Sequence, residues 1–179
     1  MQRDDLERVL FTQEQIGKRV EEIGKRIEED YRDKNPLVVG ILKGASMFFM
    51  DVVRCADIPM ELDFMAVSSY GKGATSSGNV RIRKDLDTDI RDRHVLLCED
   101  IIDSGVTMKH LFALLSARGP ASLRLCSLLS KPSRRRADIA IDYCGWEIPD
   151  AFVVGYGLDY AEKYRNLPYI GVLKPEIYS

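Results

Sequence analysis

The sequence predicts an α/β fold in which a mostly parallel, twisted sheet is flanked by helices. Two apolar segments, 37–42 and 94–98, have the length and composition of strands that are buried on both faces of a sheet. Each is followed by a short turn and then by a segment with helical spacing of its apolar residues, about 45–55 and 108–117. Alternation of strands and helices over short connections is typical of a parallel α/β sheet.

The remaining elements agree with this architecture. A capping box at 12–15 begins an amphipathic helix over 12–30, which Asn35-Pro36 separates from the first buried strand. The other strands are expected at 60–68 with a return strand at 80–82, at 121–129, at 152–155 and, more weakly, at 139–143. Because no repeat or linker interrupts the chain, we expect a single domain over 1–179.

Composition excludes several classes of protein. A net charge of -2 and a pI near 5.8 argue against a dedicated nucleic-acid binder. The four cysteines show no CxxC spacing, so the sequence suggests neither a zinc site nor a disulfide framework. No apolar run resembles a signal peptide or a membrane span. We therefore expect a cytoplasmic protein with reduced thiols.

The segment 95–108, VLLCEDIIDSGVTM, places acidic, hydroxyl-bearing and glycine residues directly behind an apolar strand. In open parallel sheets, ligands bind outside the carboxyl ends of the strands, against the start of the next helix. Backbone N–H groups and hydroxyls over 103–107 suit a phosphate monoester, and Glu99 with Asp100 suits paired sugar hydroxyls. The alternative, that Asp103 caps the following helix, does not explain two adjacent carboxylates. The segment therefore predicts a sugar-phosphate site.

This segment resembles the phosphoribosyl-pyrophosphate motif of the type I phosphoribosyltransferases, and the chain is similar to their hypoxanthine-guanine members, particularly the bacterial ones. Five further stretches extend the resemblance over nearly the whole chain: LKGA at 42–45, SSYG at 68–71, LLSKPSRR at 128–135, FVVGYGLDYAEKYRNLPYIGVL at 152–173 and the terminal KPEIY. Two residues depart from the family pattern. Cys98 stands where a small aliphatic residue is usual, and Val106 replaces a lysine seen in some members.

The resemblance implies the type I phosphoribosyltransferase fold, with a small hood formed from the N-terminal and C-terminal segments and a flexible lid loop. It implies purine salvage by transfer of a 5-phosphoribosyl group from phosphoribosyl pyrophosphate to hypoxanthine or guanine, with magnesium as cofactor. It assigns phosphoribosyl binding to Glu99, Asp100, Asp103, Ser104, Gly105, Val106 and Thr107, pyrophosphate binding to Lys43, Gly44 and Arg165, purine binding to Lys131, Phe152 and Val153, magnesium binding to Glu99, Asp100 and Asp159, and the lid to Ser69 and Tyr70.

The chemistry of the assigned residues fits these roles. Asp103 occupies the family position that handles the proton on purine N7, which makes it the expected catalytic residue. Lys131 only donates hydrogen bonds, so it complements the 6-oxo group of hypoxanthine, guanine or xanthine and is mismatched to the 6-amino group of adenine. The resemblance also includes a peptide that can be cis, at Lys43–Gly44. Taken alone, Lys131 is a surface lysine, Phe152 a core residue and Asp159 a turn residue.

Two further alternatives concern the charged and flexible segments. Arg165 suits pyrophosphate because of its planar fork, but it is also placed for a surface ion pair with Glu162. The segment 69–79 contains too few apolar residues to pack, which indicates either an active-site lid or an ordinary hairpin loop.

Three other functions compete with the enzyme. A nucleotide-sensing RNA-binding regulator on the same fold is supported only by the basic cluster Arg134–Arg136. A xanthine-preferring transferase differs only in contacts that residue types do not reveal. A dinucleotide enzyme is disfavoured because no GxGxxG follows a strand. The expected partners are small-molecule substrates and further copies of the chain in a homodimer or homotetramer, with neither nucleic acid nor membrane.

Overall fold

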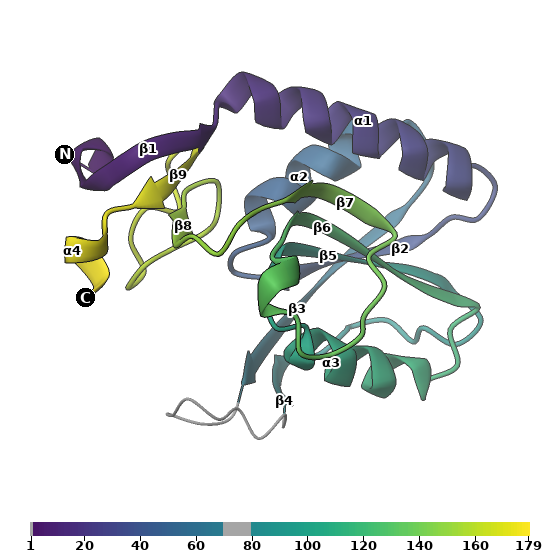
Figure 1. The fold of residues 1–179 in the computed structure, drawn as a ribbon. Helices are drawn as coiled ribbons and strands as arrows, with labels where there is room; N and C mark the ends of the chain where they lie inside the picture. Colours follow the sequence, from purple (N-terminus) through teal and green to yellow (C-terminus); the bar gives the residue numbers. More distant parts are fainter. Residues whose placement is uncertain (1, 70–79) are drawn as a thin grey trace.

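The computed structural model describes residues 2–69 and 80–179 and shows two sheets (Figure 1). The larger sheet consists of β2 (Leu37–Leu42), β3 (Glu61–Ser69), β4 (Val80–Lys84), β5 (His94–Ile102), β6 (Ser122–Ser130) and β7 (Tyr143–Glu147). The smaller sheet consists of β1 (Leu6–Phe11), β8 (Val153–Val154) and β9 (Ile170–Leu173). The helices are α1 (Gln13–Tyr31), α2 (Ser46–Cys55), α3 (Val106–Ser116) and α4 (Pro175–Tyr178), with short 3-10 turns η1 (Gln2–Asp5) and η2 (Pro132–Arg134).

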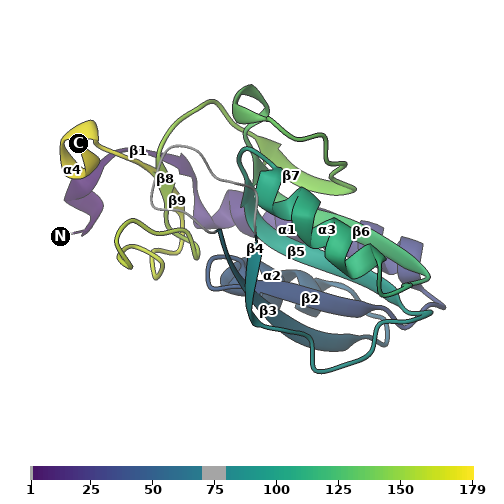
Figure 2. The same cartoon turned by 90° about the horizontal axis from the view of Figure 1, so that it is seen from below.

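The larger sheet is mostly parallel, which confirms the predicted fold class. Its strand order is β4-β3-β2-β5-β6-β7, and β4 alone pairs antiparallel, with β3. Helices α1 and α2 cover one face of this sheet and α3 covers the other (Figures 1 and 2). Two apolar cores lie between these layers, one beneath each set of helices. Because helices cover both faces of the sheet, its central strands consist of nearly continuous apolar residues.

Helix α1 begins as its sequence predicts. Thr12 is the N-cap residue, and its hydroxyl accepts a hydrogen bond from the backbone N–H of Gln15 at 3.3 Å. The side chain of Gln15 accepts one in return from the backbone N–H of Thr12 at 2.8 Å. This capping box satisfies two N–H groups that a helix end leaves unpaired. The apolar stripe of α1, which includes Ile16 and Ile23, is buried against the sheet.

Two strand boundaries differ from the prediction. Strand β5 does not end at Cys98, because its parallel pairing with β6 continues to Ile102 opposite Ser130. The weak strand expected at 139–143 is wrong, since β7 begins only at Tyr143. Just before β7, Asp142 already bonds to β6: its backbone N–H donates to the carbonyl of Leu125, and its carboxylate accepts from the N–H of Leu125.

The start of α3 also differs from one reading of the sequence. The N-cap residue is Gly105, in the left-handed conformation with φ 77°, and the hydroxyl of Ser104 accepts a hydrogen bond from the backbone N–H of Val106 at 3.4 Å. Asp103 is therefore not the helix cap. Its carboxylate is left available for other contacts.

The small sheet brings both ends of the chain together. β1 pairs antiparallel with β9, and β9 pairs antiparallel with β8. Strands at 6–11 and 170–173 are not predicted by the sequence, because neither segment has a clear apolar alternation. Figure 1 shows this sheet beyond the end of the large sheet where β2 leads into α2 and β5 leads into α3. It therefore faces the carboxyl ends of the parallel strands.

The predicted lid lies only partly within the described residues. The lid is predicted at Ser69 and Tyr70; Ser69 is the last residue of β3, and Tyr70 lies outside the described residues.

Over residues 2–69 and 80–179, none of the helices has the length and apolarity that spanning a membrane requires.

Candidate active site

The predicted phosphate motif forms a small hollow where β5 passes into α3. Its volume is about 130 Å³. The lining residues come from one continuous segment: Glu99, Ile101, Ile102, Asp103, Ser104, Gly105, Thr107 and Met108. Val106 is the first residue of α3, so the N-terminus of that helix borders the hollow. The N-terminus of a helix of this length provides N–H groups and a positive dipole end for an anion.

Two adjacent carboxylates stand at the strand end beside this hollow. The backbone N–H of Asp100 donates to Glu99 at 3.0 Å, and the N–H of Ile101 donates to Asp100 at 2.7 Å. Burial raises the pKa of Glu99 well above its usual range, and the charge of Asp100 raises it further. Burial also raises the pKa of Asp100. Within the described residues neither carboxylate forms an ion pair, so the pair is suited to hydroxyl donors or a cation.

The turn after β2 packs directly against these carboxylates. A Cβ atom at Gly44 would lie 1.7 Å from Oδ2 of Asp100, so only glycine fits there. A Cβ atom at Gly157 would in turn lie 2.0 Å from the carbonyl oxygen of Gly44. The cis peptide of this turn joins Leu42 to Lys43, one bond before the Lys43–Gly44 peptide expected from the resemblance. Three segments distant in sequence therefore meet at Gly44.

The guanidinium of Arg165 contacts several residues of the segment that includes Gly157. Its Nη1 donates to the carbonyl of Gly157 at 2.7 Å, and its Nη2 pairs with Asp159 at 2.8 Å and with Glu162 at 3.4 Å. Lys43 pairs with the same Glu162 carboxylate at 3.0 Å. The alternative of an Arg165–Glu162 ion pair is thus present, but it is one contact of several. The structure brings Lys43, Asp159 and Arg165 together.

The proposed purine side lies at the end of β6. Lys131 is only 8% exposed, its backbone N–H donates to the carbonyl of Ile102, and its Nζ lies 3.5 Å from Asp150. Arg134 pairs with Asp150 at 3.3 Å and with Asp103 at 2.9 Å. Lys131 is therefore not a solvated surface lysine. Ion pairs through Asp150 and Arg134 connect Lys131 to Asp103.

Phe152 belongs to an aromatic group outside the main core. Its ring stacks on Tyr178 of α4 with centroids 4.7 Å apart, and it meets Tyr160 edge-on at 5.6 Å. The next residue, Val153, is buried in β8, the edge strand of the small sheet. Phe152 itself is half-buried and packs at the border of the small apolar cluster that includes Val154 and Leu173, so its core alternative applies in part.

Several residues of this arrangement were missed in the sequence. Asp150 lies in no motif, since a lone aspartate after proline is a common surface feature, and Tyr178 belongs to the terminal KPEIY stretch but received no role from it. Glu162 was considered only as an ion-pair partner of Arg165. Spacing in the sequence could not have found them, because each acts through a residue from another segment.

The comparison with known families decides the classification. Residues 9–161 match the model of the phosphoribosyl transferase domain. The chain belongs to this family. The resemblance found in the motifs is thereby confirmed.

Individual relatives show which members of this family the chain is similar to. The chain is 53% identical to the hypoxanthine-guanine phosphoribosyltransferase of Bacillus subtilis (strain 168), over 100% of this chain and 99% of the relative. A hypoxanthine phosphoribosyltransferase structure from Staphylococcus aureus superposes with a TM-score of 0.97 at 50% identity, covering 99% of this chain and 97% of that one. A hypoxanthine phosphoribosyl transferase structure from Trypanosoma cruzi gives a TM-score of 0.93 at 42% identity, covering 98% and 95%.

Proposed function

We propose that the protein transfers the 5-phosphoribosyl group of phosphoribosyl pyrophosphate to hypoxanthine and guanine, giving IMP or GMP and pyrophosphate in purine salvage. The observation that supports this proposal is that three parts of the site meet at one edge of the large sheet. These parts are the phosphate hollow, the carboxylate pair against Gly44, and the buried Lys131 on the neighbouring strand. Each matches one portion of the two substrates.

The proposed mechanism depends mainly on positioning and on electrostatics. Backbone N–H groups and hydroxyls over 103–107 hold the 5-phosphate, while Glu99 and Asp100 accept hydrogen bonds from the ribose hydroxyls. Lys43, Gly44 and Arg165 hold the departing pyrophosphate. Fixing both ends of the substrate orients the anomeric carbon as it becomes cation-like.

The base is oriented by the residues on the purine side. Lys131 donates to the 6-oxo group, and the edge strand at Val153 faces the polar edge of the base with its backbone. Tyr178 covers one face of the Phe152 ring, so the purine is assigned to the other face. Asp103 accepts the proton from N7, and Arg134 holds the Asp103 carboxylate through an ion pair at 2.9 Å.

The donor chemistry of the site fits magnesium as the cofactor. Mg²⁺ takes one or two carboxylates and completes its shell with phosphate oxygens and water. Glu99 and Asp100 form such an oxygen pair, and the repulsion between them would be relieved by a cation. Asp159 is engaged by Arg165, and in the described part of the chain no three acidic, His or Cys side chains gather as a metal-binding group. When bound, the ion supplies positive charge to the pyrophosphate.

Two of the three arginines in the basic cluster that favours the RNA-binding alternative are engaged within the protein. Arg134 pairs with Asp103 and Asp150, and Arg135 donates to the hydroxyl of Ser130 at 2.7 Å. These arginines are committed to contacts within the protein. Comparing turnover of xanthine with that of hypoxanthine and guanine tests the xanthine-preferring alternative.

Three further expectations complete the proposal. A lid at Ser69 and Tyr70 that excludes water stays a prediction. A homodimer or homotetramer is supported by Met47 and Met50, each 44% exposed on the same helix. A cytoplasmic location is supported by four cysteines that are all free.

The proposed function is tested by assaying hypoxanthine, guanine, xanthine and adenine separately with phosphoribosyl pyrophosphate and magnesium. Turnover is expected with hypoxanthine and guanine, and chelation of the metal is expected to abolish it. Activity with adenine alone would refute the role given to Lys131. RNA binding without any transfer would replace the enzyme by the regulator.

A further inference from the structure

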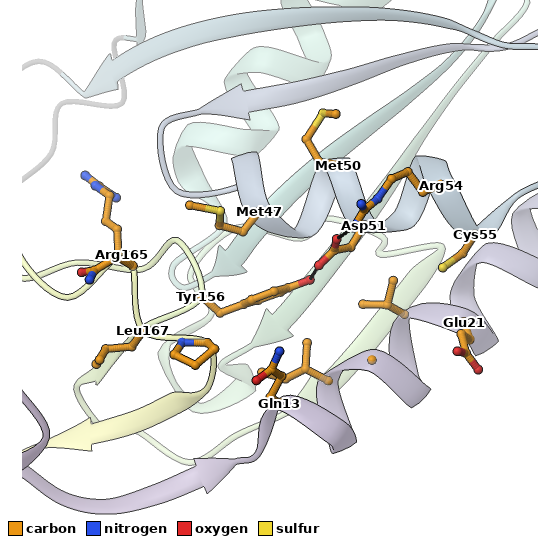
Figure 3. A pocket seen from close by; sticks show the side chains of 15 residues that line it. Gln13, Glu21, Met47, Met50, Asp51, Arg54, Cys55, Tyr156, Arg165 and Leu167 are labelled. Carbon is orange, nitrogen blue, oxygen red and sulfur yellow. Dashed lines mark hydrogen bonds and ion pairs between the residues drawn. The ribbon is translucent and has the colours of Figure 1, made fainter.

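A groove of about 740 Å³ runs between α1, α2 and the segment that leads into β9 (Figure 3). In its wall, the hydroxyl of Tyr156 donates a hydrogen bond to Oδ2 of Asp51 at 2.5 Å. Tyr156 is 8% exposed, and burial raises its pKa, so the hydroxyl keeps its proton. Neither residue belongs to the substrate-binding groups described above. The bond links the middle of α2 to the loop after β8.

Tyr156 fixes the part of this loop that carries the pyrophosphate residues. Its backbone has a positive φ of 51°, and its N–H donates to the carbonyl of Leu167 at 2.8 Å. The next residue, Gly157, donates its N–H to the carbonyl of Arg165 at 2.9 Å and accepts from the Arg165 guanidinium at 2.7 Å. The position of Tyr156 therefore sets the position of Arg165.

Asp51 fixes the opposite wall of the pyrophosphate region. The turn at Lys43 and Gly44 leads directly into α2, and the hydroxyl of Ser46 donates to the carbonyl of Lys43 at 2.7 Å. Asp51 lies further along this same helix. Because Gly157 packs against the carbonyl of Gly44, a shift of the loop relative to α2 would separate Arg165 from the turn.

We propose that Asp51 and Tyr156 are positioning residues for pyrophosphate: their hydrogen bond holds the Arg165 loop against the Gly44 turn. This inference rests on the proposed function, since it assumes that both segments contact pyrophosphate. It predicts a larger effect on phosphoribosyl pyrophosphate than on the purine, because Lys131, which is assigned to the 6-oxo group, lies at the end of β6 beside Asp150 and outside the Tyr156 loop.

The central test is Tyr156→Phe, which removes the hydroxyl and keeps the ring that lines the groove. The KM for phosphoribosyl pyrophosphate and the Kd for pyrophosphate with magnesium, measured by calorimetry, are each expected to rise about tenfold, or about 1.4 kcal/mol, the scale of one hydrogen bond to a charged group. The KM for hypoxanthine is expected to change less than about twofold.

A second pair of variants tests the acceptor. Asp51→Ala removes it and is expected to reproduce the effect of Tyr156→Phe, and the double variant is expected to be no worse than either single one. Asp51→Asn keeps an oxygen that accepts from the tyrosine, so it is expected to restore most of the affinity for pyrophosphate.

The chain offers a matched control in Tyr143. Its hydroxyl donates to Asp30 at the same 2.5 Å, and this bond joins β7 to the end of α1, away from the pyrophosphate turn. Tyr143→Phe is expected to lower the melting temperature without altering either KM.

The outcomes separate the inference from the function on which it rests. If Tyr156→Phe and Asp51→Ala lose stability as Tyr143→Phe does but keep wild-type affinity for pyrophosphate, the positioning role is wrong. If Tyr156→Phe does not fold, Asp51→Ala and Asp51→Asn decide the question by the same measurements. Absence of transfer and of pyrophosphate binding in the wild type would instead overturn the proposed function.

Discussion

The two halves of the candidate site are built in opposite ways. The phosphate half comes from one continuous segment, Glu99 to Thr107, and its carboxylate pair forms no ion pair among the described residues, although the charge of Arg165 acts on Asp100. The pyrophosphate half is assembled from separate segments, and its charges neutralise one another: Lys43 pairs with Glu162, and Arg165 pairs with Asp159.

The difference reflects what holds each half in place. Backbone N–H groups of a strand end and a helix start are fixed by the fold, so the phosphate half needs no additional support. Long side chains from separate loops lose rotamer freedom when they are fixed, and internal ion pairs keep them oriented before the substrate arrives. The purine side follows the second pattern, since Lys131 is paired with Asp150.

The largest effect is expected from Asp103→Asn in the continuous half. The amide cannot accept the N7 proton as a carboxylate does, so kcat is expected to fall by about 10² to 10⁴. Binding of phosphoribosyl pyrophosphate should stay within about threefold, because the hollow holds phosphate mainly through backbone groups. Steady-state kinetics and calorimetry measure the two quantities.

Asp57→Asn, at an exposed position after α2, controls for the loss of one surface charge. Unchanged turnover in Asp103→Asn would remove the proton-transfer role. An equal loss of turnover in both variants would do the same.

A smaller, selective effect is expected from Lys131→Ala in the assembled part. Loss of one charged donor to the 6-oxo group should weaken binding of hypoxanthine by about 10- to 100-fold, while phosphoribosyl pyrophosphate binds nearly as before. Kinetics with each substrate varied in turn distinguishes the two affinities. Lys109→Ala, an exposed lysine of α3, serves as the control. Equal losses for both substrates would contradict the assignment of Lys131 to the base.

The smallest effect concerns the stability of the unliganded protein. Burial and the charge of Asp100 raise the pKa of Glu99 above its ordinary value of 4.5, so this buried carboxyl group imposes a penalty on the free energy of folding once the pH rises above 4.5. As pH falls from the raised pKa toward 4.5, this penalty disappears and the free energy of unfolding rises.

Glu99→Gln removes this pH dependence and is expected to stabilise the protein by about 1 kcal/mol at pH 8, with a smaller gain at pH 5. Denaturant unfolding at both pH values measures the gain, and Glu29→Gln on the exposed face of α1 is the control. A gain of the same size at both pH values would show that repulsion between the carboxylates is not its source.

The sequence predicted the large sheet well and the small sheet poorly. Strand β2 and helix α1 were expected within a residue of their bounds, because buried apolar runs and a capping box are local signals. β1 and β9 were not expected, since a short edge pairing depends on the partner strand. The end of β5 was placed too early for the same reason: the pairing with β6 extends it to Ile102.

What the sequence by itself determined was the fold class, the family and the continuous phosphate motif, because each is encoded in neighbouring residues. Only the tertiary structure decided that Gly44, Asp100 and Gly157 share one point of contact. It also decided that Lys131 is buried beside Asp150 and that Tyr156 is bound to Asp51. These contacts join residues far apart in the chain, and their formation depends on how the layers pack rather than on any local pattern.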